Sequence, residues 1–461
     1  MTLVIVMIMV LGYVLIATAH ITHVNKAAIA MFMGAVGWVL YICYGADYVM
    51  SQHTEGYTDF LGGAAASSEA VKYYICDNIF IKYVAKASGI VLFLLATMSI
   101  IEILNNNGCF DFICEWIRTR NSKRLMWTLT CAAFLISANL DNFTTTVTML
   151  VIMRSIVQNR RQRMIIGSAV VLAANAGGCF TVIGDPAGVV LWGTGAVTAS
   201  NFSAYLALPA VVAWAVPTWL LGRLLPDRLD VEWPATPYRG DDTNLNRWQR
   251  LLMLFVGIGG LWFIPTFHNI TKLAPFLGAL CVLSVLWVVN EAFNRKLMTA
   301  DQNIQRRTPL AIQYGTIQQM LFVMGIVLAM GVAQETGIFG KVAAWTDANI
   351  HNVWTVGAVS GLASGLIDSF TVAMTNFSLY SVAATTADSY TSAFMQNGLF
   401  WKITAFSTGV GGSLMCFAST SGLALMKMER MRVGWYLKNC SLRVLAGWGL
   451  GLLVLAAETW M

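Results

Sequence analysis

Four acidic residues stand inside apolar segments of the chain, where an ionisable side chain is unusual. They are Glu102, Asp141, Asp185 and Asp368. Asp141 lies within the sequence SANLDNFTTTVTML, Asp185 within NAGGCFTVIGDPAG, and Asp368 within SGLIDSFTVAMTNF. Charged side chains are costly in hydrocarbon and usually serve an ion, a proton or a substrate there. These four positions are therefore the first candidates for chemistry.

Neutral oxygen donors surround the same stretches. They are Asn142, Thr144, Thr145, Thr146, Thr181, Ser413, Ser419, Thr420 and Ser421. With the carboxylates and the carbonyls that are freed where a helix breaks, they form an oxygen-rich environment that suits a hard cation such as Na⁺ or Li⁺. A carboxylate can also hold a proton in place of that cation. We therefore predict that Na⁺ and H⁺ compete for one site, with Na⁺ at Asp141, Asn142 and Asp185.

The composition places these acids in a membrane protein. Hydrophobic residues make up 57% of the 461 positions, charged residues make up 11%, and the mean hydropathy is +0.64, far from the roughly 25% charged share of a soluble domain. The lipid bilayer is then the main surrounding of the chain. The net charge of +6 comes largely from segments between apolar runs, so it indicates membrane orientation, and a nucleic-acid partner has no support. Nine cysteines show no metal-ligand spacing, and we expect no cofactor.

The apolar runs predict an all-α polytopic fold with about ten transmembrane helices. The expected crossings are residues 2–19, 27–46, 87–104, 164–192, 202–225, 251–267, 273–292, 313–333, 399–426 and 441–457. Glycines interrupt 164–192 and 399–426, and Pro186 removes an amide donor in the first of these, so both are predicted to be broken helices. The outside segment 47–86 has no assigned role; within it, SSEAVKYYICDNIFIKYVAK, residues 67–86, is predicted to be an interfacial helix or a dimer contact.

Two further segments are predicted to be re-entrant helical hairpins. Residues 125–157 carry LDN at their centre and have basic flanks, RTRNSKR before and RRQR after, so a hairpin that keeps both flanks in the cytoplasm fits the positive-inside rule. Residues 353–385 carry LIDSF at their centre and have flanks with almost no Lys or Arg, which favours an outside-facing hairpin. The same reasoning places the N- and C-termini outside.

The two halves of the chain repeat each other in sequence. LFLLATMSIIEI matches LFVMGIVLAMGV, SANLDNFTTTVTM matches SGLIDSFTVAMTN, and GGCFTVIGDPAGVVL matches GGSLMCFASTSGLAL, in the same order along the chain. Five crossings and one hairpin per half would make the second half enter from the opposite face. This predicts an inverted-topology repeat, as in many secondary transporters, with residues 1–225 as the first half, 226–246 as a cytoplasmic linker and 247–461 as the second half.

Together with VNKAA and WYLKN, these motifs resemble those of NhaD-type sodium/proton antiporters of the ion transporter superfamily. The resemblance implies an elevator-like transporter that exchanges Na⁺ and Li⁺ for H⁺, a homodimer, and a bacterial inner membrane. It also implies that the ion-site positions are Asp141, Asn142, Thr145, Asn175, Asp185 and Asp368, with Glu102 as an intramembrane acid and Thr144, Thr181, Ser413 and Ser419 in secondary roles. The chain departs from the family's usual Asp-Asn-x-Pro at the second tip, where it has Asp-Ser-Phe-Thr, so the ion preference stays open.

Other interpretations remain possible on the sequence. An anion carrier of the same superfamily, moving a di- or tricarboxylate with Na⁺, would share the hairpin layout but usually has neutral tips where this chain has Asp141. An enzyme lacks a recognisable catalytic motif, and a channel needs no buried acids on broken repeats. Asp141, Asp185 and Asp368 could also serve only as helix N-caps, and Glu102 could extend to the membrane surface.

Overall fold

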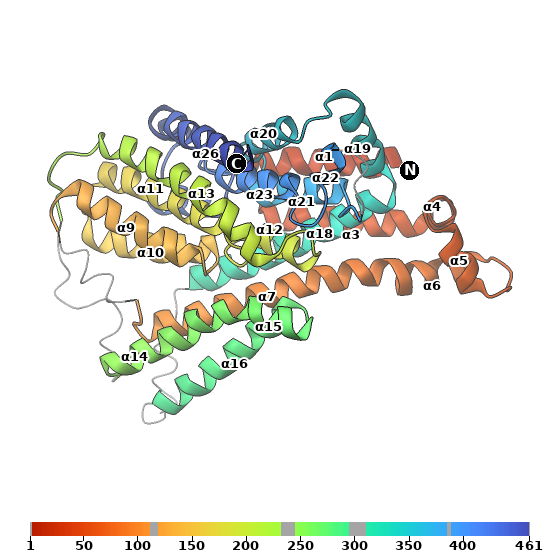
Figure 1. Cartoon of the computed structure of the whole chain (residues 1–461), viewed down its shortest axis with the longest axis horizontal. Coiled ribbons are helices and arrows are strands. Elements are labelled where there is room, and N and C mark those ends of the chain that lie inside the picture. Colours follow the sequence, from red (N-terminus) through yellow and green to blue (C-terminus); the bar gives the residue numbers. More distant parts are fainter. Residues whose placement is uncertain (1, 111–118, 232–244, 295–309, 385–388, 461) are drawn as a thin grey trace.

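The computed structural model describes residues 2–110, 119–231, 245–294, 310–384 and 389–460. Regular structure in these ranges is helical, apart from three isolated β-bridges (Figure 1). The first half contains α1 (Thr2–Ala17), α2 (Ala19–Thr22), α3 (Lys26–Cys43), α4 (Gly45–Gln52), α5 (Thr54–Leu61), α6 (Ser68–Tyr74), α7 (Ile81–Asn106), α9 (Ser122–Ser137), α10 (Asn142–Ile156), α11 (Arg160–Cys179), α12 (Pro186–Gly193) and α13 (Ala199–Gly222). The second half contains α14 (Arg247–Leu254), α15 (Gly260–Thr271), α16 (Pro275–Asn294), α18 (Leu310–Glu335), α19 (Ile338–Asn349), α20 (Val353–Ser364), α21 (Ser369–Leu379), α22 (Ser389–Ser392), α23 (Leu399–Gly411), α24 (Thr420–Glu429), α25 (Val433–Tyr436) and α26 (Leu442–Trp460).

Seven helical stretches in the described ranges are long and apolar enough to cross a bilayer, and each overlaps a predicted crossing. They are Lys26–Cys43, Ser68–Asn106, Ala199–Gly222, Arg247–Thr271, Pro275–Phe293, Thr316–Glu335 and Val433–Thr459. The chain is therefore an integral membrane protein, as its composition predicts. The total of ten crossings stays a prediction, because α1 is a shorter apolar helix and the other two predicted crossings are interrupted.

The interruptions lie where the glycines predict them. α11 ends at Cys179 and α12 begins at Pro186, whose missing amide and fixed φ suit the first turn of a helix. In the second half, α23 ends at Gly411 and α24 begins at Thr420. Each broken helix thus leaves a short non-helical segment between two half-helices, and that segment has backbone groups free to face a ligand.

Each predicted hairpin consists of two helices joined by a few non-helical residues. α9 and α10 form the first pair, and α20 and α21 form the second. Both ends of the first pair contact the start of the predicted linker: the amide of Ser122 donates to the carbonyl of Asp227, and the amide of Gln158 donates to that of Asp230. The ends of this hairpin therefore lie side by side. Residues 232–244 of the linker and 385 of the second hairpin fall outside the described ranges.

The third crossing is longer than the sequence suggests. From Ser68 the chain is helical through α6, a π-helical stretch (Ile75–Phe80) and α7, giving 39 residues in all. At 1.5 Å per residue this is about 58 Å, well beyond the roughly 30 Å of hydrocarbon in a bilayer. The helix therefore begins well before the predicted crossing at residue 87, and residues 68–86 are continuous with the crossing helix.

Equivalent helices of the two halves make equivalent contacts. α3 packs on α18 and α16 packs on α7; α9 packs on α11 and α20 packs on α23. Contacts between the two halves are also matched, since α10 contacts α24 while α21 contacts α12. Each half-helix that follows a break is therefore held by the hairpin of the other half. This arrangement brings the two hairpin tips and the two breaks together.

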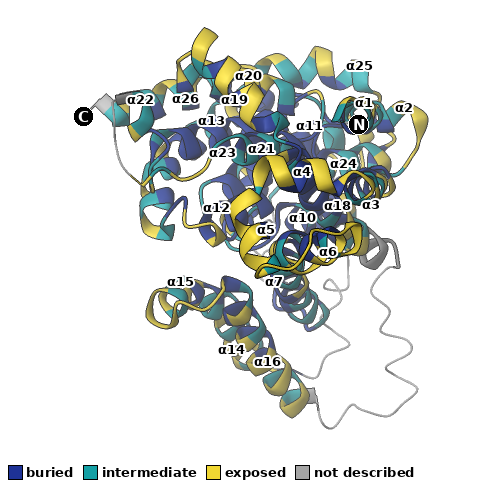
Figure 2. Cartoon of the chain, turned by 90° about the vertical axis from the view of Figure 1, so that its right-hand side faces the viewer, coloured by how far each residue is buried: buried dark blue, intermediate teal, exposed yellow. Residues whose placement is uncertain are grey.

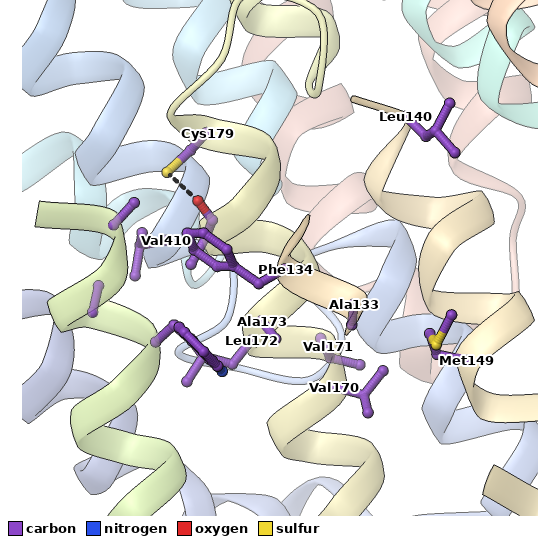
Figure 3. Packing of buried hydrophobic residues seen from close by; sticks show 14 of the residues in the cluster. Ala133, Phe134, Leu140, Met149, Val170, Val171, Leu172, Ala173, Cys179 and Val410 are labelled. Carbon is purple, nitrogen blue, oxygen red and sulfur yellow. Dashed lines mark hydrogen bonds between the residues drawn. The ribbon is translucent and has the colours of Figure 1, made fainter. Parts of the chain in front are cut away.

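The hairpins touch the broken helices at close range because glycines stand at the crossing points. A Cβ on Gly177 would collide with the backbone of Phe134, and a Cβ on Gly411 would collide with the backbone of Gly361. The aligned glycines thus allow the same close approach of α11 to α9 and of α23 to α20. Figure 3 shows apolar side chains of α9 and α11 here, among them Phe134, Leu172 and Ala173, and Cys179 donating to the carbonyl of Ala176.

A peripheral group formed by α14, α15 and α16 lies to one side of this core and packs on α7 (Figure 2). Its outer face carries large apolar side chains that are 68–80% exposed, namely Trp248, Phe255, Trp262, Ile270 and Val288. In a membrane protein such a face is suited to contact with lipid. The polar residues of interest lie in the core, away from this face.

Candidate functional site

Asp141 caps α10 at the first hairpin tip and is 2% exposed. One carboxylate oxygen, Oδ2, accepts from the amide of Thr144 at 3.1 Å and lies 3.4 Å from the hydroxyl of the same residue. The other oxygen, Oδ1, accepts from Nε2 of Gln319 on α18 at 2.7 Å. Asp141 therefore acts as a helix N-cap, the alternative role that the sequence suggests, and its second oxygen also contacts another helix.

Asp185 caps α12 at the first helix break. Its Oδ1 accepts from the amide of Ala187 at 2.8 Å, and its Oδ2 accepts from Nδ2 of Asn142 at 2.9 Å. Since Asn142 directly follows Asp141, this hydrogen bond brings the two acidic positions to one place. The predicted set of Asp141, Asn142 and Asp185 is therefore assembled from the hairpin tip and the break.

Among the described residues, no basic side chain forms an ion pair with either of these two carboxylates. In the described part of the chain, ion pairs involve Asp368, Glu335 and Glu429 but not Asp141 or Asp185. The partners of these two acids are backbone amides, a hydroxyl and side-chain amides. An ionised carboxylate held away from water requires a compensating charge. A bound proton or a bound cation can supply it, which is the chemistry that the sequence predicts.

A small pocket lies beside Asp185. Thr181, Gly178 and Gly188 line it from the first helix break, and Ser369 and Thr408 line it from α21 and α23 of the second half; the other lining residues are Cys179, Ala187, Phe202, Ala405 and Gly409. Asp185 is partly exposed there. The pocket thus offers one carboxylate and several neutral oxygens at the junction of the halves.

Several buried oxygen atoms on α10, α11, α18 and α24 have no hydrogen-bond partner among the described residues. They are the hydroxyls of Thr145, Thr146 and Ser421, Oδ1 of Asn175 and Oε1 of Gln319. Buried polar atoms are nearly always paired in proteins, so an unpaired set needs an explanation. These are hydroxyl and amide oxygens, the ligand type that a hard alkali cation prefers. The donor chemistry therefore fits a small cation as a substrate.

Asn175 joins the two halves at their centre. Its Nδ2 donates to the hydroxyl of Ser413 at 2.8 Å and lies 3.2 Å from that of Ser419, and the side chain is 1% exposed. Ser419 also caps α24 by accepting from the amide of Gly422. The three predicted positions Asn175, Ser413 and Ser419 are thus brought together, one from the first break region and two from the second.

The remaining predicted positions have other surroundings. Thr181 donates to the carbonyl of Ala138 at 2.5 Å and accepts from the amide of Gly184 at 3.0 Å, so it fastens the break to the hairpin tip. Glu102 is half-buried on α7, and the hydrogen bonds of the aspartates described above do not involve it. The part of Glu102 in the ion site therefore stays a prediction.

Asp368 caps α21 through Oδ1, which accepts from the amides of Phe370 and Thr371. Its Oδ2 lies 3.2 Å from Nζ of Lys26, and both side chains are buried. Sequence reasoning overlooks Lys26 as a site residue, although it stands in the VNKAA motif. It also overlooks Gln319, one of three glutamines on the predicted crossing 313–333. Both contacts join distant parts of the chain, so no local pattern reveals them.

A second ionic cluster lies at the other end of α10 and α11. Glu429, whose side chain is 1% exposed, is 3.0 Å from Nε of Arg163 and 3.3 Å from Nε of Arg154. Arg160 donates to the backbone carbonyls of Glu429 and Arg430. This cluster fastens the end of α24 to the first half, and it lies outside the set predicted to bind ions.

Comparison with known proteins identifies the group to which the chain belongs. Residues 1–411 match the family described as citrate transporter, CitMHS. Sodium/proton antiporter 1 of Arabidopsis thaliana is 32% identical over 368 residues, which are 80% of this chain and 61% of that protein, so the chain spans less than two thirds of this relative. Sodium/proton antiporter 2 of the same plant is 29% identical over 449 residues, or 97% of each chain.

Bacterial relatives and a solved structure agree with this match. The Na⁺/H⁺ antiporter NhaD of Vibrio parahaemolyticus is 26% identical over 74% of this chain and 83% of that protein, which confirms the predicted resemblance. The crystal structure of the YdaH transporter of Alcanivorax borkumensis covers 86% of this chain and 90% of its own, with a TM-score of 0.56 and 13% identity, and so has the same fold. The family and these relatives are named as transporters, which confirms that the chain is not an enzyme, and none of the names indicates a cofactor. The chain therefore belongs to the citrate transporter (CitMHS) family of membrane transporters.

Proposed function

We propose that this protein exchanges Na⁺ for H⁺ across a membrane. The observation that carries the proposal is the pair Asp141 and Asp185, linked through Asn142 and surrounded in the described ranges by neutral donors only. Each carboxylate needs a positive charge when ionised, and both H⁺ and Na⁺ can provide it. Relatives named as Na⁺/H⁺ antiporters support this reading.

Exchange follows from competition at this site. When Na⁺ binds, it displaces a proton from the pair of carboxylates; when the site returns, a proton replaces Na⁺, so the charge of the site stays the same. If the site changes sides only when one or the other is bound, the two fluxes are coupled in opposite directions. Thr145 and the amide oxygens of Asn175 and Gln319 are available to complete the oxygen shell around Na⁺.

We infer that the site moves between the two sides by an elevator-like motion of an inverted repeat. The matched contacts α3 with α18 and α16 with α7, and α10 with α24 and α21 with α12, support the repeat. The paired ends of the first hairpin, beside residues 227 and 230, support a re-entrant segment with both basic flanks on one side. In this proposal the hairpins and broken helices form the moving unit.

Three finer features of the prediction belong to the same proposal. Li⁺ is a hard cation like Na⁺ and takes the same oxygen ligands, so we expect it to be carried as well. We further expect a homodimer in a bacterial inner membrane, with both termini outside. The charge pattern and the resemblance support these expectations.

Transport of a di- or tricarboxylate with Na⁺ is the second candidate, and the family's description as citrate transporter favours it. Such an anion needs positive partners near its carboxylates. The described site instead contains Asp141 and Asp185, and the ammonium of Lys26 is already paired with Asp368. Electrostatic repulsion therefore opposes a polycarboxylate at this place.

Proton movement measured with an internal pH probe, in liposomes that contain the purified protein, distinguishes these two functions. Addition of Na⁺ or Li⁺ alone should move protons, whereas K⁺ or citrate should not. Asp141→Asn keeps the shape and removes the titrating group, so it should abolish the response. The matched control is Asp227→Asn in the linker, which should behave like the wild type. A proton flux that requires citrate as well as Na⁺ would favour the anion carrier.

A further inference from the structure

The ammonium of Lys26 is enclosed by oxygen atoms of the second half. It lies 3.2 Å from Oδ2 of Asp368, donates to the carbonyl of Phe417 at 3.0 Å and lies 3.5 Å from the carbonyl of Ala418. Lys26 is 8% exposed and Asp368 is 2% exposed. One carboxylate and two carbonyl oxygens thus surround a positive charge at the meeting point of the second hairpin tip and the second helix break.

The internal repeat gives this place a counterpart in the first half. The matched motifs align Asp368 with Asp141, and they align Phe417 and Ala418 with Ile183 and Gly184. The two tips also use their carboxylates alike. One oxygen caps the following helix, and the other receives a group from a distant helix. The Lys26 ammonium therefore lies at the counterpart of the proposed cation site.

The difference between the two tips is the charge of the group received. At Asp141 that group is the neutral amide of Gln319, and at Asp368 it is the ammonium of Lys26. The second acid of the first half, Asp185, aligns with the neutral Ser419. The first half therefore holds two carboxylates without a basic partner in the described ranges, whereas the second half holds one carboxylate that is already balanced.

We propose that Lys26 is a tethered cation that occupies the second-half counterpart of the ion site, so that only the first half takes up a transported cation. The inference rests on the proposed function for the first-half site and adds the number of cations that it carries. An ammonium group has three donors and a single charge, so it satisfies Oδ2 of Asp368 and the two carbonyls much as a bound alkali ion would. Lys26 thereby keeps Na⁺ away from these oxygens.

Removal of this charge should open a new cation site. Lys26→Met keeps a long, unbranched side chain but leaves Asp368 without its partner, so Na⁺ can take the vacated position. In equilibrium binding of radioactive Na⁺ to the purified protein, the wild type should bind about one Na⁺ per chain and Lys26→Met about two. Lys26→Arg keeps the charge and should match the wild type. The double variant Lys26→Met with Asp368→Asn should return to about one, because it lacks the carboxylate.

The possible results separate this inference from the proposed function. If the wild type binds one Na⁺ and folded Lys26→Met binds no more than that, Lys26 is only a structural partner and the inference is wrong. If the wild type binds none and Lys26→Met gains one, the tethered cation stands, and the proposed first-half site is wrong. A count that rises in Lys26→Met and falls again in the double variant supports both.

Asp368→Asn alone provides a test that does not depend on the folding of Lys26→Met. It retains the lysine and removes the carboxylate, so no transported Na⁺ is lost under our proposal and the count stays at the wild-type value. A loss of Na⁺ binding in a folded Asp368→Asn protein would make Asp368 a direct ligand of the transported ion and would overturn the inference. Size-exclusion chromatography establishes the folded state of each variant.

Discussion

The buried cluster around Glu429 allows one prediction to be worked out in magnitude. Its carboxylate is 1% exposed, and both of its oxygens lie 3.0–3.1 Å from Nε of Arg163. Glu429→Gln removes the negative charge and leaves this guanidinium in a largely buried place, where it is 17% exposed. Breaking a buried pair by removing one partner costs about 3–5 kcal/mol of unfolding free energy.

The neighbouring groups reduce that figure. Arg163 still donates to the carbonyls of Val157 and Gln158, and Arg154 is 45% exposed and can turn to water. We therefore expect Glu429→Gln to lose about 2–3 kcal/mol, close to the value of hydrogen bonds to a charged group. Arg154→Gln should lose less than about 1 kcal/mol, because an exposed pair contributes little.

Equilibrium unfolding of the purified protein in mixed micelles, as detergent composition is varied, measures both losses. Glu429→Gln and Arg154→Gln are compared with the wild type at low and high salt. The smaller Arg154 effect should fade at high salt, because the exposed charge is screened, while the Glu429 effect should persist. Equal losses for the two variants, or no loss for Glu429→Gln, would refute the reasoning about this cluster.

Three other predictions concern the tip, the crossing points and the loops. Gln319→Leu removes a 2.7 Å donor to Asp141, so half-maximal exchange should need about tenfold more Na⁺, the equivalent of 1.4 kcal/mol; an unchanged requirement would mean that the amide is not part of the site. Gly177→Ala should prevent folding through its collision with the adjacent helix, whereas Gly193→Ala, which has open space, should fold normally, as yield in fluorescence-detected chromatography will show. Burial, together with a hydrogen bond to a carboxylate on α19, raises the pKa of Tyr390 to about 12. This phenol therefore stabilises the protein below pH 10, and the stabilisation is lost as the pH rises toward 12. In Tyr390→Phe the melting temperature should fall less steeply over that pH range, and an equally steep fall in the variant would contradict this.

Local patterns in the sequence predict most of the long helices and both helix interruptions. Asp141, Asp185 and Asp368 each stand before a helix, where a side-chain oxygen can accept from free amides, and each caps the helix that follows. Pro186 in the first break likewise begins α12. These features depend on residues a few positions apart, which is why a single sequence reveals them.

Two contacts between distant residues could not be predicted. Lys26 reaches an acid 342 positions away, and Gln319 reaches one 178 positions away, so neither contact leaves a local signal. The extended helix at residues 68–86 escaped prediction for another reason. Its charged residues Lys72 and Asp77 suggest a separate surface segment, but a helix that continues beyond the hydrocarbon can carry such charges in water.

The dependence of Na⁺ affinity on pH tests the central claim most directly. If Na⁺ and a proton compete for the carboxylates of Asp141 and Asp185, the Na⁺ concentration for half-maximal binding rises about tenfold per unit fall in pH once the proton is bound. Radioactive Na⁺ binding to the purified wild type over a pH series measures this dependence, and Asp141→Asn should abolish it. A Na⁺ affinity that is the same at every pH in folded wild-type protein would contradict the claim that the two ions take turns at one site.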